Sequence, residues 1–323
     1  MSTVPDVSVV IATYNRASIL PAALESILNQ DTQGATYEVI LVDNNSTDRT
    51  GEIAKSFIDS SDGKLRYIFE PNQGVSFARN AAIEKARAPI IAFFDDDVQI
   101  APNWIATIKR TLDSHQEVSC IGGKVLPRWE SDPPVWLTRE HWAPLALQDY
   151  GEESFLVNFN RPLCLISANL AVRRSAFDEI GLFEPELQRV KDGIGSMEDM
   201  ELLVRLWRAQ MSAMYVPELI AETTVPLVRA TKNYHRRWHR GNGHFYAMLR
   251  WEDMENSSTG RLFDIPAHQY RQAIEASVTW LKKFLAGNSQ DAFLAETRLQ
   301  FIFGFARNRN KSASSAKRAT ENK

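Results

Sequence analysis

The chain has 323 residues, of which 44% are hydrophobic and 24% are charged, so it has the composition of a globular protein with one large core or two smaller ones. Its formal net charge of -3 argues against a chain-wide nucleic-acid-binding surface, and we expect no nucleic-acid partner. Two cysteines, Cys120 and Cys164, are too few for a disulfide framework or a thiolate metal site, so we expect both to be reduced and buried.

The N-terminus lacks the basic region and the long apolar region of a signal peptide. No uninterrupted apolar run approaches the ~18 residues that a membrane-spanning helix needs. We therefore expect a cytoplasmic protein.

The first third of the chain alternates apolar strands with helical patterns. Strands rich in β-branched and aromatic residues are predicted at residues 7–13, 37–43, 65–69 and 89–94. The segments between them have apolar residues at helical spacing. This alternation predicts an α/β fold with a mostly parallel sheet that is covered by helices on both faces. Ligands of such sheets bind at the carboxyl ends of the strands.

The pattern changes in the second half of the chain. In order, we expect a helix at 104–114, a strand at 118–125, a long loop at 126–160, a helix at 198–210, a strand at 212–217 and helices at 234–251, 266–287 and 291–306. Residues 307–323 are polar, basic and rich in small side chains, which predicts disorder. We therefore divide the chain into residues 1–225, a helical C-terminal extension at 226–306 and a basic tail at 307–323.

Three consecutive carboxylates, Asp95, Asp96 and Asp97, follow the fourth predicted strand in the segment IIAFFDDDVQI. Because each charge raises the cost of ionising the others, the run needs an explanation. A solvated turn would suffice, but the segment begins apolar and resumes with VQI. An aspartate-rich prenyl-diphosphate site would need a further Asp at Gln99 or Ile100. We favour a divalent cation beside a nucleotide diphosphate, since in an extended segment Asp95 and Asp97 point to the same side, and hard cations bind carboxylate and phosphate oxygens.

A dinucleotide-binding dehydrogenase is the obvious rival for such a sheet. It needs a glycine-rich turn after the first strand, so that the backbone can approach a pyrophosphate. The corresponding turn here is TYNRAS, which has no glycine. We reject this alternative.

Five ordered segments together resemble the signatures of the inverting GT-A glycosyltransferases of family 2: VSVVIATYNRASIL, VILVDNNSTDRT, NQGVSFARNAAIEKA, IIAFFDDDV and GSMEDMELLVRL. The resemblance covers roughly the first 220 residues and is more specific than a lone Asp-x-Asp motif. It implies a GT-A domain with a Rossmann-like sheet, a nucleotide-diphosphate sugar donor, with UDP-sugars the commonest in the family, and Mn²⁺ or Mg²⁺ as cofactor.

The resemblance also implies roles for particular residues. Asp199 would be the catalytic base with Glu198 beside it, Asp97 would bind the metal, and Asp95 would contact the ribose. No particular role follows for Asp96, which points away from its neighbours in an extended segment. The nucleotide-binding set implied in this way is Thr13, Tyr14, Asn15, Arg16, Asp43, Asn45, Arg79, Asp95 and Asp96.

The acidic pair Glu198 and Asp199 has a simpler explanation as well. Acids are common in the first turn of a helix, where the helix dipole favours them, and Glu201 with Arg205 would form a surface ion pair. With the family resemblance we favour Asp199 as the base. Glu198 stays an alternative, because sequence does not orient the two side chains.

A run of cations follows the last predicted strand. It is either a solvated basic helix or a clamp for a diphosphate or an anionic acceptor. His235 and His239 stand at i, i+4 but lack the Glu of a zinc-protease helix, so we give a zinc site little weight. The cations are Arg229, Lys232, Arg236, Arg237, Arg240 and Arg250.

The sequence departs from the family at the segment AETTVPLVRA. Many members carry a metal-binding His there, whereas this chain has Thr223 and Thr224. Either His235, His239 or His244 substitutes, or the site lacks that ligand.

Two further segments have two interpretations each. The tryptophans of the loop at 126–160 either fasten it to the core or stack on an acceptor sugar. The apolar face of residues 293–309, beside the basic tail, is either a packing surface or a peripheral contact with the inner face of an anionic membrane.

The sequence thus predicts a metal-dependent inverting glycosyltransferase whose acceptor is a glycan or a lipid-linked saccharide. A sugar-nucleotide-forming nucleotidyltransferase is one alternative, although it should have a glycine-rich loop with Arg and Lys after the first strand. A nucleotide-sugar-binding protein without turnover is the other.

Overall fold

The computed structural model describes residues 4–188, 194–249 and 260–321, with side chains as far as Arg309. These residues form two compact units. Of the described residues, unit 1 comprises 4–129, 146–188 and 198–225, and unit 2 comprises 130–145, 194–197, 226–249 and 260–321. Of the helices described, none is both long and apolar enough to cross a membrane.

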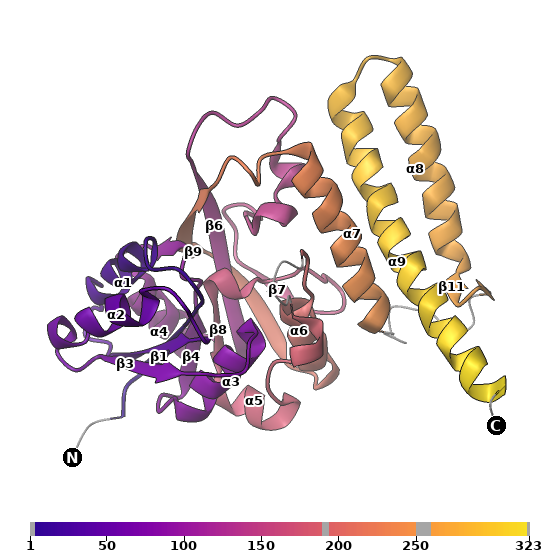
Figure 1. The fold of residues 1–323 in the computed structure, drawn as a ribbon. Coiled ribbons are helices and arrows are strands. Elements are labelled where there is room, and N and C mark those ends of the chain that lie inside the picture. Colours follow the sequence, from indigo (N-terminus) through magenta and orange to yellow (C-terminus); the bar gives the residue numbers. More distant parts are fainter. Residues whose placement is uncertain (1–3, 189–193, 250–259, 322–323) are drawn as a thin grey trace. The chain divides into compact units, whose positions relative to one another are not determined.

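Within its described residues, unit 1 is built on a nine-stranded mixed sheet with the order β3-β2-β1-β4-β8-β6-β9-β5, and β7 also pairs with β9 (Figure 1). Parallel pairing joins β3, β2, β1 and β4, and also β6 with β9. Antiparallel pairs connect these two groups and add β5 and β7. The strands are β1 (Val7–Thr13), β2 (Tyr37–Asp43), β3 (Leu65–Phe69), β4 (Ile90–Phe93), β5 (Val98–Ile100), β6 (Val118–Trp129), β7 (Phe155–Val157), β8 (Leu170–Arg173) and β9 (Ser212–Val225).

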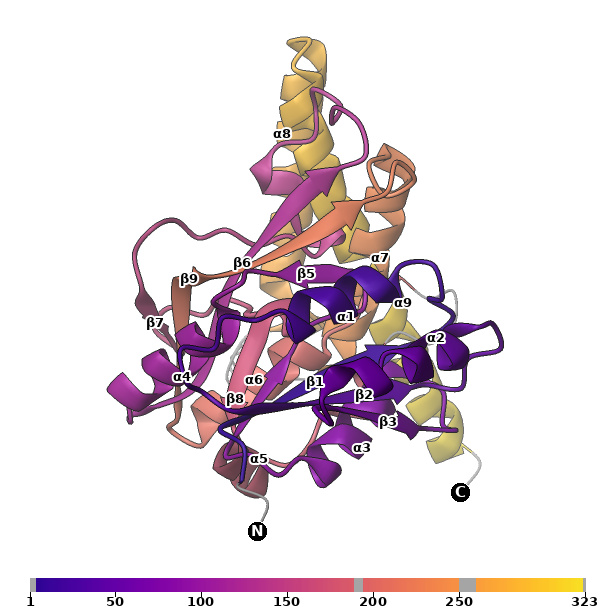
Figure 2. The ribbon, with the colours of Figure 1, turned by 90° about the vertical axis from the view of Figure 1, so that its left-hand side faces the viewer.

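Helices cover both faces of this sheet, as the near-continuous apolar strands require. In Figure 2, α1 and α2 lie on one side of the parallel strands and α3 lies on the other. The helices of unit 1 are α1 (Leu20–Leu28), α2 (Thr50–Ser56), α3 (Val75–Lys85), α4 (Trp104–Ser114), α5 (Arg174–Ile180) and α6 (Glu198–Arg208). The predicted α/β fold is confirmed, with a mixed sheet in place of a mostly parallel one.

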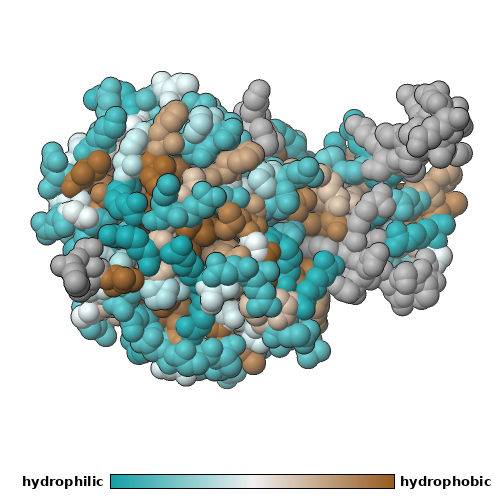
Figure 3. All heavy atoms as spheres, turned by 90° about the horizontal axis from the view of Figure 1, so that it is seen from below, coloured by the Kyte–Doolittle hydropathy of each residue, from teal (hydrophilic) through white to brown (hydrophobic). Residues whose placement is uncertain are grey.

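The neighbouring strands β1 and β2 are buried along almost their whole length. Every residue of β2 is buried, and so is every residue of β1 except Ala12. On the surface seen in Figure 3, apolar residues are interspersed with hydrophilic ones. Neither cysteine forms a disulfide. Cys120 is buried as expected, whereas Cys164 is only partly buried.

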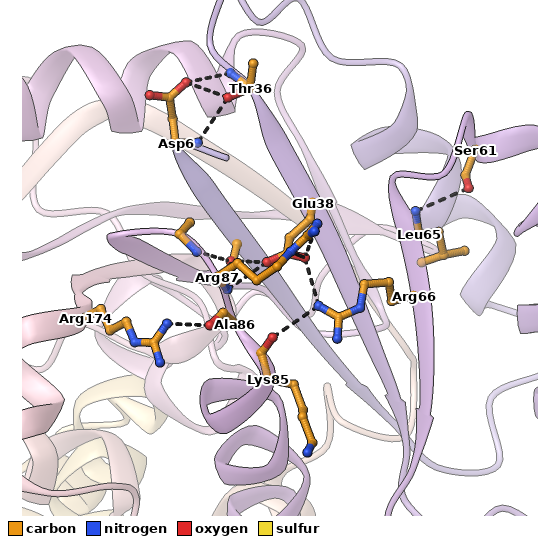
Figure 4. A network of polar contacts seen from close by, with 12 residues as sticks. Asp6, Thr36, Glu38, Ser61, Leu65, Arg66, Lys85, Ala86, Arg87 and Arg174 are labelled. Atoms are coloured by element: carbon orange, nitrogen blue, oxygen red, sulfur yellow. Dashed lines mark hydrogen bonds and ion pairs between the residues drawn. The ribbon is translucent and has the colours of Figure 1, made fainter. Parts of the chain in front are cut away.

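Glu38 joins the amino ends of the parallel strands through a buried network (Figure 4). Its carboxylate accepts hydrogen bonds from the Ser8 hydroxyl at 2.7 Å, the Arg66 guanidinium at 2.9 Å and the Arg87 Nε at 2.8 Å. Burial raises the pKa of Glu38, but these hydrogen bonds outweigh burial and leave the pKa below its ordinary value. The network lies at the amino ends of the parallel strands, whereas ligands of such sheets bind at the carboxyl ends.

Unit 2 consists mainly of three helices, α7 (Lys232–Leu249), α8 (Ala267–Leu285) and α9 (Ser289–Glu321), with a short hairpin of β10 (Arg261–Leu262) and β11 (Ile265–Pro266). Helix α9 packs against both α7 and α8. The helix continues to Glu321 through the segment for which the sequence predicts disorder. The alanines, lysines and arginines of that segment are good helix formers, so composition alone is compatible with both states.

Candidate active site

The three aspartates lie in a tight turn between two strands that occupy different places in the sheet. Strand β4 ends at Phe93 between β1 and β8, whereas β5 begins at Val98 and pairs with β9. The backbone N–H of Val98 donates to the carbonyl oxygen of Asp95 at 3.1 Å, which closes the turn. The expectation of an extended segment is therefore wrong, because the chain has to leave β4 and cross to the far edge of the sheet.

This turn is not the solvated turn that would explain the acidic run trivially. Asp96 is its most buried member, with 8% of its surface exposed, and one carboxylate oxygen lies 3.7 Å from Nε of Arg16. Burial raises the pKa of Asp96 to about 7, the charge of Asp97 adds to the rise, and Arg16 opposes it. Asp96 thus contacts the loop after β1, whereas the sequence assigned it no particular role.

A buried arginine joins the two groups of candidate carboxylates. Arg79 of α3 donates from one guanidinium nitrogen to Asp95 at 3.1 Å, and its other nitrogen lies 3.5 Å from Glu198 and 3.7 Å from Asp199. Only 5% of the Arg79 surface is exposed, so these interactions are weakly screened by solvent. Arg79 therefore connects the aspartate turn after β4 with the first turn of α6.

Asp199 is held by the backbone as well as by Arg79. Its Oδ2 accepts a hydrogen bond from the backbone N–H of Ser167 at 3.1 Å. Burial raises the pKa of Asp199 above the ordinary value, although Arg79 and Ser167 both act in the opposite direction. A carboxylate with a raised pKa at a ligand-binding edge is suited to accept a proton near neutral pH.

The loops after β1 and β2 are fastened to each other. The Asn15 side chain accepts a hydrogen bond from the backbone N–H of Thr47 at 2.8 Å, and the Asn15 backbone N–H donates to the Ser46 hydroxyl at 3.0 Å. Asn15 and Asn45 have positive φ angles of 52° and 65°, a conformation that asparagine tolerates better than most residues. The structure thus brings these two candidate nucleotide-binding loops together.

The remaining candidates differ in exposure. Thr13 is buried at the end of β1, whereas Tyr14 is exposed. Both oxygens of Asp43 are engaged, Oδ1 by the backbone N–H of Ser46 at 2.9 Å and Oδ2 by the hydroxyl of Tyr67 at 2.7 Å. Burial raises the pKa of Tyr67, and the hydrogen bond to Asp43 raises it further, so Tyr67 stays a donor.

Two residues that shape the edge of the site escaped the sequence analysis. The Asn44 side chain donates to the carbonyl oxygen of Asn72 at 2.6 Å and accepts from the backbone N–H of Gly74 at 2.6 Å. Gln188 accepts from the backbone N–H of Ser76 at 2.7 Å and so caps α3, the helix that carries Arg79. A Cβ at Gly74, whose φ is 144°, would lie 2.2 Å from the Gln188 side chain. Gln188 is distant in sequence, so the glycine at position 74 is the one feature near α3 that could have indicated this close contact.

A divalent cation at this site would need several oxygen ligands. Of the described residues, no three or more His, Cys, Asp and Glu side chains form a cluster that could hold a metal. At the position where the resemblance suggests a histidine, Thr223 is buried and donates to the backbone carbonyl of Asp97 at 3.2 Å. Magnesium usually takes only one or two carboxylates from the protein and completes its shell with phosphate oxygens and water. A single protein carboxylate, that of Asp97, is compatible with a cation held in that way.

Four side chains of unit 2, those of Trp136, His141, His235 and Phe293, form an aromatic cluster. His235 is fully buried, with its ring centroid 5.0 Å from that of Trp136, and Trp136 lies 4.9 Å from Phe293. Burial and the nearby His239 lower the pKa of His235 to about 4. Trp136 thus fastens the predicted loop to α7 and α9, in agreement with the packing interpretation.

The basic run after β9 is partly engaged inside unit 2. Arg236 forms an ion pair with Glu296, Arg240 donates to Gln300, and Lys232 lies over the ring of Phe293 at 5.0 Å from its centroid. Packing between α7 and α9 therefore accounts for these three cations. Arg250 lies outside the described residues.

With this geometry established, the sequence was compared with known proteins. The family model described as glycosyl transferase family 2 matches residues 8–181, more than half of the 323 residues. The chain belongs to glycosyl transferase family 2. The resemblance drawn from the five sequence segments is thereby confirmed.

Curated relatives match over part of their length. Glycosyltransferase AglE of Haloferax volcanii is 37% identical over 124 residues, which are 38% of this chain and 40% of that protein. An N-acetylglucosaminyltransferase of Mesorhizobium japonicum is 29% identical over 229 residues, 69% of this chain and 52% of that protein. The chain thus matches about half or less of the length of these relatives.

Two solved structures share the fold. Staphylococcus aureus TarS 1-349 in complex with UDP has a TM-score of 0.54 at 16% identity and covers 96% of this chain and 91% of its own. GalNAc-T7 with UDP, GalNAc and Mn2+ also has a TM-score of 0.54, at 17% identity, over 80% of this chain and 52% of its own.

Proposed function

We propose that this protein transfers a sugar from a nucleotide-diphosphate donor to a hydroxyl of a glycan or lipid-linked saccharide, with inversion at the sugar C1. The observation that carries the proposal is the buried Arg79, which contacts Asp95 on the donor side and Glu198 and Asp199 on the acceptor side within 3.1 to 3.7 Å. Glycosyltransferase names among the relatives support the reaction class. UDP in both solved neighbours favours a UDP-sugar.

In this proposal each half of the site has a separate task. The loops that contain Thr13, Asn15 and Asp43 bind the nucleotide, and Asp95 binds the ribose. Asp97 holds a divalent cation, Mn²⁺ or Mg²⁺. When bound, the cation neutralises the charge that develops on the leaving diphosphate.

Asp199 acts on the acceptor side. Its carboxylate accepts the proton of the acceptor hydroxyl while the hydroxyl oxygen bonds to C1 and the bond from C1 to the diphosphate oxygen breaks. The nucleoside diphosphate leaves with that electron pair. We assign this role to Asp199 in preference to Glu198, because 18% of the Asp199 side chain is exposed against 7% for Glu198. A base has to reach its substrate.

The decisive test is a panel of nucleotide sugars, assayed for binding with and without Mn²⁺ and then for transfer or slow donor hydrolysis. We expect Asp199→Asn to keep donor binding and to lower transfer by ~10²–10⁴-fold, the usual contribution of a general base. We expect Asp97→Asn to weaken the metal-dependent part of donor binding. Asp113→Asn, at an exposed residue that pairs with Lys109, is the control and should match the wild type.

Two outcomes would contradict the proposal. If no nucleoside diphosphate binds with or without metal, the donor class is wrong. If Asp199→Asn transfers sugar as fast as the wild type, Asp199 is not the base.

A further inference from the structure

Helix α8 is apolar on two opposite faces. One face packs against α9: Ala276 is buried, and Lys283 forms an ion pair with Asp291 of α9 at 2.6 Å. The opposite face carries four large apolar side chains that are exposed to solvent, namely Ile274 (65%), Val278 (47%), Leu281 (50%) and Leu285 (75%). At about 100° per residue, Val278 and Ala276 point in nearly opposite directions.

We call these four residues the α8 stripe. Their spacing of four, three and four residues is that of the a and d positions of a coiled coil, which bury a seam against a second helix. An apolar helix face is normally buried against another element. Because α9 covers only one face, the stripe lacks a cover among the described residues. Phe284 beside it is also 61% exposed, and its ring stacks on that of Trp280.

We propose that the α8 stripe is a self-association surface on which α8 of a second copy of this chain packs in antiparallel orientation about a two-fold axis. With the axis between Thr279 and Trp280, Ile274 lies against the partner's Leu285 and Val278 against the partner's Leu281. The symmetry operation repeats both contacts, which gives four apolar layers. The inference does not depend on the proposed enzymatic function.

The charges beside the stripe favour this orientation. Glu275 and Lys282 lie on the same flank of α8, and both are exposed. In the antiparallel pair, Glu275 is offset from the partner's Lys282 by two residues, about 3 Å along the helix axis, and the pair occurs twice. A parallel pair would instead stack Arg271 on the partner's Arg271, with like charges opposed.

The helix ends are also compatible with the antiparallel pair. Arg271 would lie just beyond the partner's Leu285, at the C-terminus of the partner's α8, where a cation interacts favourably with the helix dipole. An anionic membrane is the competing partner for an apolar helix face. The antiparallel copy offers Glu275 two symmetry-related contacts with Lys282, whereas a lipid surface leaves Glu275 with Arg271 of its own helix, 3.6 Å away, as its partner.

The test is sedimentation velocity of the full chain over a wide concentration series. Four layers form a small interface, so we expect reversible dimers with a dissociation constant on the order of micromolar or weaker. Leu281→Glu should abolish the dimer. Thr279→Glu, which adds the same charge on the same helix away from the stripe, should leave it unchanged.

A charge exchange tests the orientation. Glu275→Lys and Lys282→Glu should each weaken the dimer by about tenfold, since each places like charges together twice. The double variant should restore the affinity of the wild type. Far-UV circular dichroism of each variant checks that the helices remain folded.

Three results would overturn the proposal. These are a wild type that stays monomeric at every concentration, a dimer that Leu281→Glu leaves intact, and a double variant that does not regain affinity. If monomeric protein instead binds vesicles of anionic phospholipid and Leu281→Glu abolishes that binding, the stripe is a membrane contact.

Discussion

Arg79 carries more interactions at the candidate site than its position in the sequence suggests. The resemblance places it near the nucleotide, whereas in the structure its guanidinium is occupied by Asp95, Glu198 and Asp199. Three carboxylates around one buried cation repel each other once that cation is removed. The protonation state of Asp199, the proposed base, therefore depends on Arg79 as well as on Asp199 itself.

We predict that Arg79→Met shifts the acidic limb of the pH–rate profile to higher pH. Burial already raises the pKa of Asp199, and Arg79 is the main group that opposes the rise. Without Arg79, the pKa of Asp199 should rise further, so a higher pH is needed to ionise the base. The shift should be on the order of one pH unit or more, as for other carboxylates that lose an adjacent cation.

The matched control is Arg49→Met, which removes an exposed arginine just before α2 that forms an ion pair with Glu52 at 2.9 Å. Its pH–rate profile should coincide with that of the wild type. An unshifted acidic limb in Arg79→Met would show that Arg79 does not set the protonation of the base. Donor hydrolysis followed from pH 5 to pH 9, with saturating donor, is the measurement.

The individual residues of the site differ in how far sequence predicts them. Asp95, Asp97 and Asp199 are recognisable because each belongs to a motif at the end of a strand or the start of a helix. Gln188 caps α3 from a segment more than a hundred residues away, so no local pattern reveals it. The burial of Asp96 was missed for another reason, since a turn was mistaken for an extended strand.

The secondary-structure elements also differ in how far the sequence predicts them. The bounds predicted for β1, β2 and β3 agree with the structure, because a buried parallel strand is a continuous apolar run between polar loops. Strands β6 and β9 extend well beyond the predicted segments. Their outer halves pair with each other, and that of β9 also pairs with β5. Such long-range pairing leaves only a weak trace in local composition.

Helices α7 and α9 approach closely at two glycines. A Cβ at Gly243 would lie 2.0 Å from the carbonyl oxygen of Phe301, and one at Gly304 would lie 1.9 Å from the carbonyl oxygen of Arg240. Each glycine thus faces the backbone of the other helix. Backbone cannot move aside as a flexible side chain can, so this interface requires glycine at both positions.

We predict that Gly304→Ala destabilises unit 2 by about 1–3 kcal/mol, the usual cost of overpacking. The new methyl group has to displace the α7 backbone at Arg240. Gly260→Ala is the control, because a Cβ at Gly260 meets no atom within 4 Å. Urea unfolding monitored by circular dichroism measures both, and equal midpoints for Gly304→Ala and Gly260→Ala would contradict the close approach.

At the scale of the whole chain, the two units should respond differently to acid. His235 of unit 2 has its pKa lowered to about 4 by burial first and then by His239, and burial also lowers the pKa of His239 to about 4. Both histidines are therefore neutral in the folded state at pH 5.5. In the unfolded chain, with ordinary pKa values near 6.5, they are mostly protonated at that pH.

These lowered pKa values fix the direction in which folding stability changes with pH. Since the folded pKa of His235 lies below the unfolded one, its contribution to stability is fully present above about pH 6.5 and is lost as pH falls from 6.5 towards 4. The pKa of Glu38 in unit 1 is also lowered, but from an ordinary value near 4.3, so stability from its network is lost only at still lower pH. Unit 2 should therefore lose stability first.

We predict that between pH 7.5 and pH 5.5 the free energy of unfolding of unit 2 falls by about 1 kcal/mol for His235 alone. Amide hydrogen exchange at both pH values, corrected for the intrinsic pH dependence, separates the two units, and the loss of protection should be confined to α7, α8 and α9. His235→Phe keeps an aromatic ring against Trp136 and Phe293 and should reduce the loss, because Phe takes up no proton in the unfolded state. Equal loss of protection in both units, or an unchanged loss in His235→Phe, would show that the buried histidines do not set the acid limit of this protein.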